Sequence, residues 1–281
     1  MDTKKILQLG AVTGICLGHA AIGKPLMSVY CYHVDRLLID TSSANNRRAL
    51  SEVLQECVID RIALTHYHED HAGNAAYLQK LKAVPVVGHV LSNQILSQGL
   101  VLRPYEYLMW GSLQKLNILD VGDVLETEHY RFQVLHTPGH SIDHVVYHEE
   151  KEGWLFSGDM FLGPRIKYFR HDECLYTTIN SLNRIAQLAF ETLFCGHNPQ
   201  SRGAMASICK KRDNLIELYA KVEDARNKGY QQAEIEKHLC KGRERFWVKL
   251  ITLGDVSFKN MVRSALHSLD RGDTVQSLIN V

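Results

Sequence analysis

Short apolar runs alternate with amphipathic stretches through the first two thirds of the chain, and this pattern predicts an α/β fold. The runs are rich in β-branched residues and end at turn residues, as buried strands do. Expected strands in the first half are Met27–Asp40 (two strands around a turn at Val34–Arg36), Cys57–Leu64 and Pro85–His89. Expected helices between and after them are Asn46–Cys57, Ala72–Leu81 and Val90–Leu102.

A second group of strands follows Asp120. These are Val124–Thr127, Tyr130–His136, Val145–His148, Trp154–Ser157 and Thr192–Cys195, with a helix at Thr177–Leu188. The segment Arg103–Leu116 is apolar and aromatic without clear periodicity, so we expect an irregular wall or lid of a pocket there.

The pattern changes at Gly203, after which strand signals give way to helical spacing. Helices are expected at Ala204–Lys228, Gln231–Leu239 and Phe258–Leu269. We therefore predict a first domain of residues 1–202 and a small helical domain of residues 203–281 that is comparable to a winged helix. This tail carries 14 of the 32 lysines and arginines and 10 of the 31 acidic residues, a surplus too small to indicate nucleic acid by itself.

Composition narrows the class of protein. Hydrophobic residues make up 45% and the formal charge is +1, so no global field favours a membrane or a nucleic acid. An apolar stretch after Lys4 and Lys5 has the outline of a signal peptide, but polar and glycine residues interrupt it, and a first strand or hairpin is preferred. The seven cysteines form no CxxC pair, which favours reduced thiols and a cytoplasmic protein.

The loop Thr65–His71 holds the most specific chemistry, because four of its seven residues are candidate metal ligands: His66, His68, Asp70 and His71. His66 and His68 are two apart in extended backbone, so both rings point to one side. A turn at Glu69 then brings Asp70 and His71 to the start of the next helix. Imidazole and carboxylate donors together suit zinc, and also iron or manganese.

Further candidate ligands follow the carboxyl ends of other predicted strands. They are Asp40, His140, Asp159 and His197. Side chains in short turns at strand ends are how an α/β scaffold builds a site. Asp40 is explained equally well as a residue that caps its own loop.

The order of Asp40, His66-x-His68-x-Asp70-His71, His140 in HTPGH, Asp159 in SGD and His197 in CGH resembles the metallo-β-lactamase superfamily. The resemblance covers roughly residues 5 to 200. It implies a four-layer αββα sandwich with two divalent metal ions, for which zinc is the first expectation, at one edge. The first ion would be held by His66, His68 and His140, the second by Asp70, His71 and His197, with Asp159 bridging them.

The same resemblance implies supporting roles nearby. Asp40 would orient a ligand, and Asp70 would also steer the attacking hydroxide and move its proton. His144 flanks the HTPGH loop and is expected either to support the ligands or to be structural. The segment after Asp159 is similar to glyoxalase II, whose basic and aromatic side chains there contact glutathione. Substrate contacts would then be Arg165, Lys167, Tyr168 and Tyr176, although an exposed loop with ordinary ion pairs explains them as well.

We expect a dinuclear metal hydrolase in which a metal-bridging hydroxide attacks the carbonyl of a small ester, thioester or lactone. The commonest true β-lactamases have a cysteine where this chain has Asp159, which disfavours lactam antibiotics. The alternative is a phosphodiesterase or endoribonuclease, the one hypothesis that would make nucleic acid a partner. A flavodiiron-type redox enzyme and a non-catalytic binding protein are less well supported. The long C-terminal helix could serve a homodimer contact.

Overall fold

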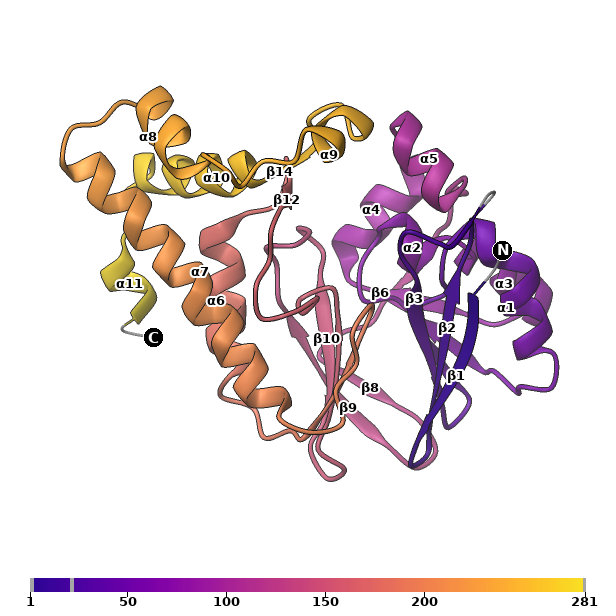
Figure 1. Ribbon diagram of the computed structural model, residues 1–281. Helices are drawn as coiled ribbons and strands as arrows, with labels where there is room; N and C mark the ends of the chain where they lie inside the picture. Colours follow the sequence, from indigo (N-terminus) through magenta and orange to yellow (C-terminus); the bar gives the residue numbers. More distant parts are fainter. Residues whose placement is uncertain (1–2, 21–22, 280–281) are drawn as a thin grey trace. The chain divides into compact units, whose positions relative to one another are not determined.

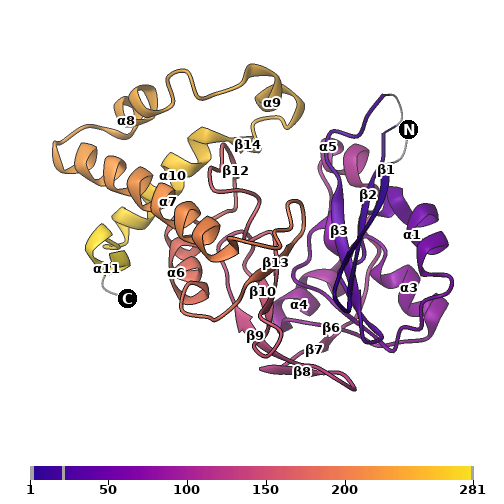
Figure 2. The ribbon, with the colours of Figure 1, turned by 60° about the horizontal axis from the view of Figure 1, so that its bottom comes forward.

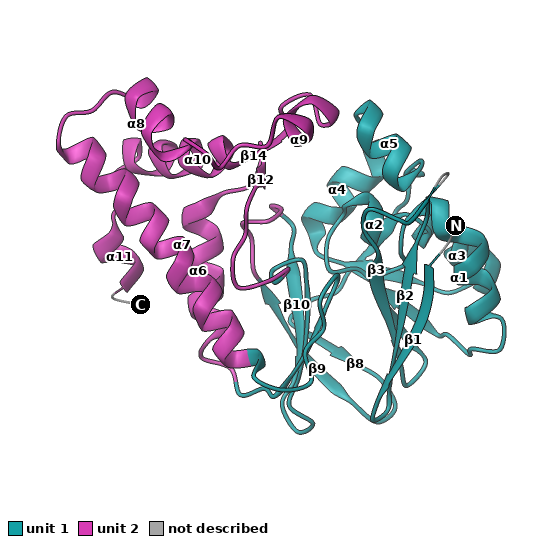
Figure 3. Cartoon of the chain, viewed as in Figure 1, with its two compact units in different colours: residues 1–136, 143–161, 189–204 teal, residues 137–142, 162–188, 205–281 magenta. Residues whose placement is uncertain are grey.

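The computed structural model describes residues 3–20 and 23–279. The chain divides into two compact units (Figure 3). The first holds residues 1–136, 143–161 and 189–204, and the second holds residues 137–142, 162–188 and 205–281. The division predicted after residue 202 stays a proposal about domains, because residues 162–188 group with the C-terminal helices.

The first unit contains a seven-stranded mixed sheet with the strand order β1 to β7. Its strands β1, β2 and β3 lie side by side in Figure 1. The first four strands are antiparallel neighbours, and β4 to β7 are parallel. The strands are β1 (Thr3–Leu9), β2 (Val12–Gly18), β3 (Val29–Val34), β4 (Leu37–Ile39), β5 (Arg61–Ala63), β6 (Val86–Gly88) and β7 (Leu119–Asp120). The predicted N-terminal hairpin and the turn before β4 are both present.

Helices cover one face of this sheet. They are α1 (Arg47–Leu54), α2 (Glu69–Ala72), α3 (Ala75–Lys82) and α4 (Val90–Gln98), with a 3-10 turn η1 (Ala44–Asn46) before α1. Leu50 and Leu54 of α1 and Leu78 of α3 are buried with Ile62 of β5 in one apolar cluster. The helical periodicity of the sequence is thus explained by burial of one stripe of each helix.

The second sheet of this unit has the order β13-β11-β10-β9-β8, with β11 and β13 parallel and the other pairs antiparallel. Figure 2 shows its strands β8, β9, β10 and β13. Its strands are β8 (Val124–Glu126), β9 (Arg131–His136), β10 (Val145–Glu149), β11 (Trp154–Gly158) and β13 (Thr192–Cys195). Buried side chains of both sheets form one core between them. Phe156 and Phe194 stack there with ring centroids 4.6 Å apart.

Replacing Phe156 by alanine should destabilise the first unit by about 3–5 kcal/mol, because it opens a cavity between the sheets. The ring is fully buried and also meets Tyr32 and Phe132 edge to face. Urea denaturation measures the loss. Leu81→Ala, at a position that is 54% exposed, is the control and should change the free energy of unfolding by less than about 1 kcal/mol. Equal losses of unfolding free energy in the two variants would show that Phe156 is not part of the core of this unit.

The second unit is mostly helical. It contains α6 (Leu175–Ile185), α7 (Ala204–Asn227, from Met205 on), α8 (Gln232–Leu239), α9 (Phe246–Ile251), α10 (Phe258–Asp270), α11 (Val275–Ile279) and the short strands β12 (Phe169–Arg170) and β14 (Val256–Ser257). α10 packs against α6 and α8. Strand β14 lies in the segment 203–281, but it pairs with β12, which lies outside that segment. In a winged helix, the two strands of the wing would both come from that segment and pair with each other.

Two local expectations are corrected by the structure. The segment expected to be irregular contains a helix, α5 (Pro104–Trp110), which begins with a proline and a capping box between Arg103 and Glu106. The short elements α9, α11, β12 and β14 had no counterpart in the predicted pattern. Among the described residues, no helix combines the length and the apolar character needed to cross a lipid bilayer.

Candidate metal centre

The candidate ligands of the first unit come together because their strands end at the same edge. Asp40 and Thr65 lie just beyond the parallel strands β4 and β5, and Asp159 and His197 lie just beyond the parallel strands β11 and β13. Within each sheet, the carboxyl ends of parallel neighbours lie side by side. The packing of the two sheets against each other brings the two pairs together. The ligand spacing in the sequence is therefore a consequence of sheet topology.

Four side chains of the first unit form a buried cluster. The donor atoms of Asp70, His71, Asp159 and His197 all lie within 4.8 Å of one another. Asp159 contacts both imidazoles, with Oδ1 3.1 Å from His71 Nε2 and Oδ2 3.4 Å from His197 Nε2. Asp70 Oδ2 lies 3.3 Å from His197 Nε2. Two carboxylates and two imidazoles at these separations have the composition of a metal site.

The direction of the ring nitrogens fits a bound cation better than direct pairing. The buried Nε2 atoms of His71 and His197 make no hydrogen bond within the described part of the chain, although carboxylate oxygens lie 3.1 to 3.4 Å away. A buried ring nitrogen without a hydrogen-bond partner lowers the stability of the fold unless another partner, such as a metal ion, takes its lone pair. Ligands that aim at one shared point produce this geometry, so the residues fit a metal ion.

The other ring nitrogens of the two histidines are anchored by the protein. His71 Nδ1 donates to Asp40 Oδ2 at 2.8 Å, and His197 Nδ1 donates to the carbonyl oxygen of Ser28 at 2.7 Å. Such bonds fix the tautomer and leave Nε2 facing a metal. Asp40 thus contacts the cluster through His71, and it also accepts both the amide and the hydroxyl of Thr65 at 2.8 Å.

The electrostatics of the cluster favour positive charge. Burial by itself lowers the pKa of His197, but the carboxylates of Asp159 and Asp70 raise it to about 10. Burial likewise opposes ionisation of Asp159, yet the neighbouring His197 and His71 hold the pKa of its carboxyl well below the usual range. The carboxylates stabilise a cation at this point, whether it is a proton on an imidazole or a metal ion.

Gly196 makes the close approach possible. A Cβ at this position would lie 2.4 Å from Asp159 Oδ1 and 2.7 Å from His71 Cε1. Any side chain here would displace two members of the cluster. The CGH motif thus needs its glycine for space as well as its histidine as a donor.

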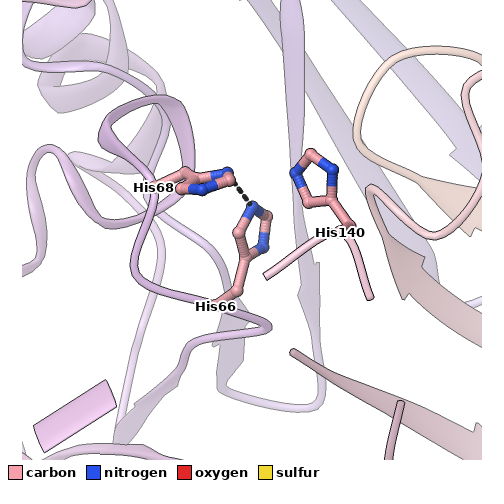
Figure 4. A group of neighbouring side chains, drawn as sticks. All are labelled: His66, His68 and His140. Atoms are coloured by element: carbon pink, nitrogen blue, oxygen red, sulfur yellow. Dashed lines mark hydrogen bonds between the residues drawn. The ribbon is translucent and has the colours of Figure 1, made fainter. Parts of the chain in front are cut away.

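His66 and His68 form a second pair of donors in the first unit. His66 Nε2 and His68 Nδ1 lie 3.0 Å apart (Figure 4). The hydroxyl of Thr65 donates its hydrogen bond to Asp40, so Thr65 Oγ1 can only accept from His66. His66 Nδ1 therefore donates to Thr65 Oγ1 at 3.0 Å. That tautomer leaves Nε2 of His66 with a lone pair for a metal.

His140, also labelled in Figure 4, lies on the loop Thr137–Ile142, which joins β9 to β10 and groups with the second unit. Within that unit its Nδ1 lies 3.1 Å from Glu173 Oε2. Glu173 Oε1 in turn accepts the amide of Arg170 at 2.8 Å. The pattern is the histidine–carboxylate pairing common at metal sites.

Three supporting groups escaped the sequence reasoning: Glu173, Thr65 and the carbonyl of Ser28. Ser28 is distant in sequence from the ligand it orients, and a main-chain carbonyl has no sequence signature. Thr65 could have been found, because it directly precedes His66. His144, expected to support the site, accepts the amide of Asp159 at 3.2 Å and lies with its ring 5.1 Å from that of His66.

The candidate substrate contacts all lie in the second unit. Arg165 lines a cavity of about 340 Å³ together with Lys221 and Arg243. Lys167 is exposed and Tyr168 is partly buried. The hydroxyl of Tyr176 lies 2.9 Å from Ser277 Oγ, and its ring packs on Tyr219, which is a structural setting. Contact of these four residues with a substrate stays a prediction.

Comparison with known proteins agrees with the motif order. Residues 26–197 match the family described as the metallo-beta-lactamase superfamily. A "Beta-lactamase-like protein 2 homolog" of Drosophila melanogaster is 34% identical over 170 residues, which are 58% of this chain and 54% of the relative. A "Hydroxyacylglutathione hydrolase" of Photorhabdus laumondii is 30% identical over 143 residues, 48% of this chain and 46% of the relative. The chain spans about half the length of these curated relatives.

Solved structures show the same fold. A metallo-beta-lactamase family protein of Thermus thermophilus superposes with a TM-score of 0.65 at 21% identity, covering 94% of this chain and 95% of the other. A beta-lactamase domain protein of Burkholderia ambifaria gives 0.70 at 16% identity, covering 94% and 88%. The expected sandwich fold with additional C-terminal helices is thereby confirmed.

Proposed function

Because the chain belongs to the metallo-β-lactamase superfamily, we propose that it is a metal-dependent hydrolase of an ester, thioester or lactone. The observation that carries the proposal is the cluster of Asp70, His71, Asp159 and His197, whose donor atoms lie within 4.8 Å of one another and whose two buried Nε2 atoms make no hydrogen bond within the described part of the chain. A relative named hydroxyacylglutathione hydrolase, similar over about half its length, supports thioester chemistry.

The proposed site holds two divalent ions, zinc in the first place. His66, His68 and His140 would bind one, and Asp70, His71 and His197 the other, with Asp159 between them. Two such ions supply a water of lowered pKa and polarise the carbonyl oxygen of the substrate. Iron or manganese would suit the same donors.

Asp70 is proposed as the residue that moves the proton. Its carboxylate is buried, and its Oδ2 lies 3.3 Å from His197 Nε2 and 3.8 Å from His71 Nε2. The carboxylate of Asp159 lies closer to His71, at 3.1 Å, so Asp70 is held less tightly by the two imidazoles. It takes a proton from the attacking water and returns it to the leaving oxygen or sulfur, as a general base and then acid.

Asp70→Asn should therefore lower kcat by about 100-fold or more while most of the bound metal remains. The amide keeps an oxygen that can bind the ion but cannot accept the proton. Turnover and metal content are measured on the same sample. A variant that loses metal in step with activity would show that Asp70 is a ligand only.

A second function, hydrolysis of a phosphodiester, is favoured by one observation. The cavity in the second unit is lined by Arg165 and Arg243, and also by Lys221, which pairs with Glu217 of the same lining. A cationic surface of this kind suits phosphate groups. The modest surplus of positive charge in the C-terminal segment points the same way.

Turnover of the metal-loaded protein on two probes in parallel tests the proposal. One is an activated phosphodiester, and the other is a panel of glutathione, coenzyme A and lactone esters, with Asp70→Asn as the control. Fast cleavage of the esters that disappears in the variant supports the proposal. Cleavage of the phosphodiester alone would replace it by the second function, and a variant that turns over at the full rate would show that the activity does not belong to this site.

A further inference from the structure

An apolar groove lies beside the metal centre in the first unit. It has a volume of about 770 Å³, within the usual range of ligand pockets. One wall is the segment before β3, with Leu26 and Met27, and the other is α5, with Tyr107, Leu108 and Trp110. We infer that this groove binds the apolar acyl part of the substrate, an inference that rests on the proposed hydrolase function.

Exposure of large apolar side chains is the first argument. Leu26 is 83% exposed, Leu108 77% and Tyr107 61%, and all three line the same groove. A contiguous set of this kind on the surface of a protein marks a binding site more often than isolated apolar residues do.

Continuity with the metal centre is the second argument. Met27 in the groove wall is followed directly by Ser28, whose carbonyl oxygen accepts His197 Nδ1 at 2.7 Å. α5 packs against α2, the turn of helix that carries Asp70 and His71. A ligand in the groove therefore lies alongside the two segments that position these residues.

The other side of the groove is tied to the same helix. Asn45, part of the lining, donates from Nδ2 to the carbonyl oxygen of Met109 in α5 at 3.1 Å. Its neighbour Ala44 touches the end of α2, since a Cβ on Gly73 would lie 2.6 Å from the amide nitrogen of Ala44. The groove wall and the ligand-bearing helix are thus one packed structure, which would hold an acyl chain in a fixed direction relative to the metal centre.

The charge of the lining selects the occupant. Lys24 and Arg47 are its formally charged members, and no carboxylate belongs to the part of the lining that the structure describes. Arg47 is already engaged, with Nε 3.2 Å from Asn74 Oδ1 and its guanidinium over the ring of Tyr77. With Arg47 engaged, the groove offers mainly apolar surface, so an acyl thioester or ester with an aliphatic chain is the substrate class that it fits.

A chain-length series tests the inference. Hydrolysis of N-acetylcysteamine thioesters from acetyl to decanoyl is measured with the metal-loaded full chain, and binding of acetate, hexanoate and decanoate is measured by calorimetry. We expect kcat/KM and affinity to rise by about two- to fourfold for each added methylene that enters the groove. In Leu26→Ser/Leu108→Ser the ratio of decanoyl to acetyl kcat/KM should fall at least tenfold. Leu81→Ser, at an exposed leucine of α3, is the matched control and should keep the ratio.

The outcomes separate this inference from the function on which it rests. Thioester hydrolysis without chain-length dependence, or with a dependence that the double variant retains, would overturn the acyl groove and leave the hydrolase. Decanoate binding that the double variant loses, without any thioester hydrolysis, would keep the groove as an acyl site and remove the proposed function.

Discussion

Asp159→Ala should lose metal and activity together. The carboxylate of Asp159 reaches both histidines of the buried cluster, His71 at 3.1 Å and His197 at 3.4 Å, and it is the residue proposed to lie between the two ions. Removing a group that only supports a metal ligand costs about 10- to 100-fold in metal affinity or activity. Loss of a ligand shared by two ions should cost more than about 100-fold in kcat/KM, with less than two ions bound per chain.

Metal content by atomic spectroscopy and turnover of the same sample measure this result. Asp60→Ala is the control, because that carboxylate is exposed and pairs with Arg36 at the surface. The control should keep both metal and activity. Full turnover of Asp159→Ala with an undiminished metal content would show that the site assignment is wrong.

The cluster of candidate ligands in the first unit could be predicted because its members sit in local patterns. Asp159 and His197 directly follow short apolar strands, and the strand ends are visible in the sequence. The loop from Thr65 to His71 carries its donors within seven residues. Parallel strands bring their carboxyl ends together within each sheet. The meeting of the two pairs of candidate ligands also depends on how the two sheets pack, which local patterns do not give.

Two kinds of feature could not be predicted: contacts between residues distant in the sequence, and segments without a periodic hydrophobic pattern. Glu173 contacts His140 from 33 residues away, and β14 pairs with β12 across more than 80 residues. α9 exposes apolar side chains such as Phe246 and Trp247, so it shows no amphipathic alternation. α5 had a readable start signal, since Pro104 follows Arg103 and Glu106 stands three residues after Arg103. Its aromatic, non-periodic composition concealed that signal.

Substitution of Asp40 should have the largest effect on stability. Asp40 is buried, and its carboxylate accepts three hydrogen bonds, from the amide and the hydroxyl of Thr65 and from His71 Nδ1. Its backbone is also left-handed, with φ of 61°. Asp40→Ala leaves these buried donors without their acceptor, which costs about 1–3 kcal/mol for each unsatisfied group. Alanine also has no polar side chain to stabilise the left-handed backbone, which costs about 1–2 kcal/mol more.

Asp40→Asn separates the two contributions. Asparagine tolerates the left-handed backbone and keeps one acceptor oxygen, so the protein should fold with a smaller loss of stability. Its amide group cannot accept from His71, so the imidazole loses its orientation and metal affinity should still fall by about 10- to 100-fold. Thermal denaturation in the presence of a chelator measures stability, and competition with a chromophoric chelator measures affinity.

Asp35→Asn is the matched control, because Asp35 is also a left-handed aspartate, with φ of 45°, whose carboxylate binds the largely exposed His129. The Asp35→Asn variant should keep its metal affinity and should lose less free energy of unfolding than Asp40→Ala. If Asp40→Asn keeps full metal affinity, Asp40 acts only as the cap of its own loop. If the affinity falls while the fold holds, Asp40 acts on the metal centre through His71, and the bond between them is as much a part of the site as the ligands themselves.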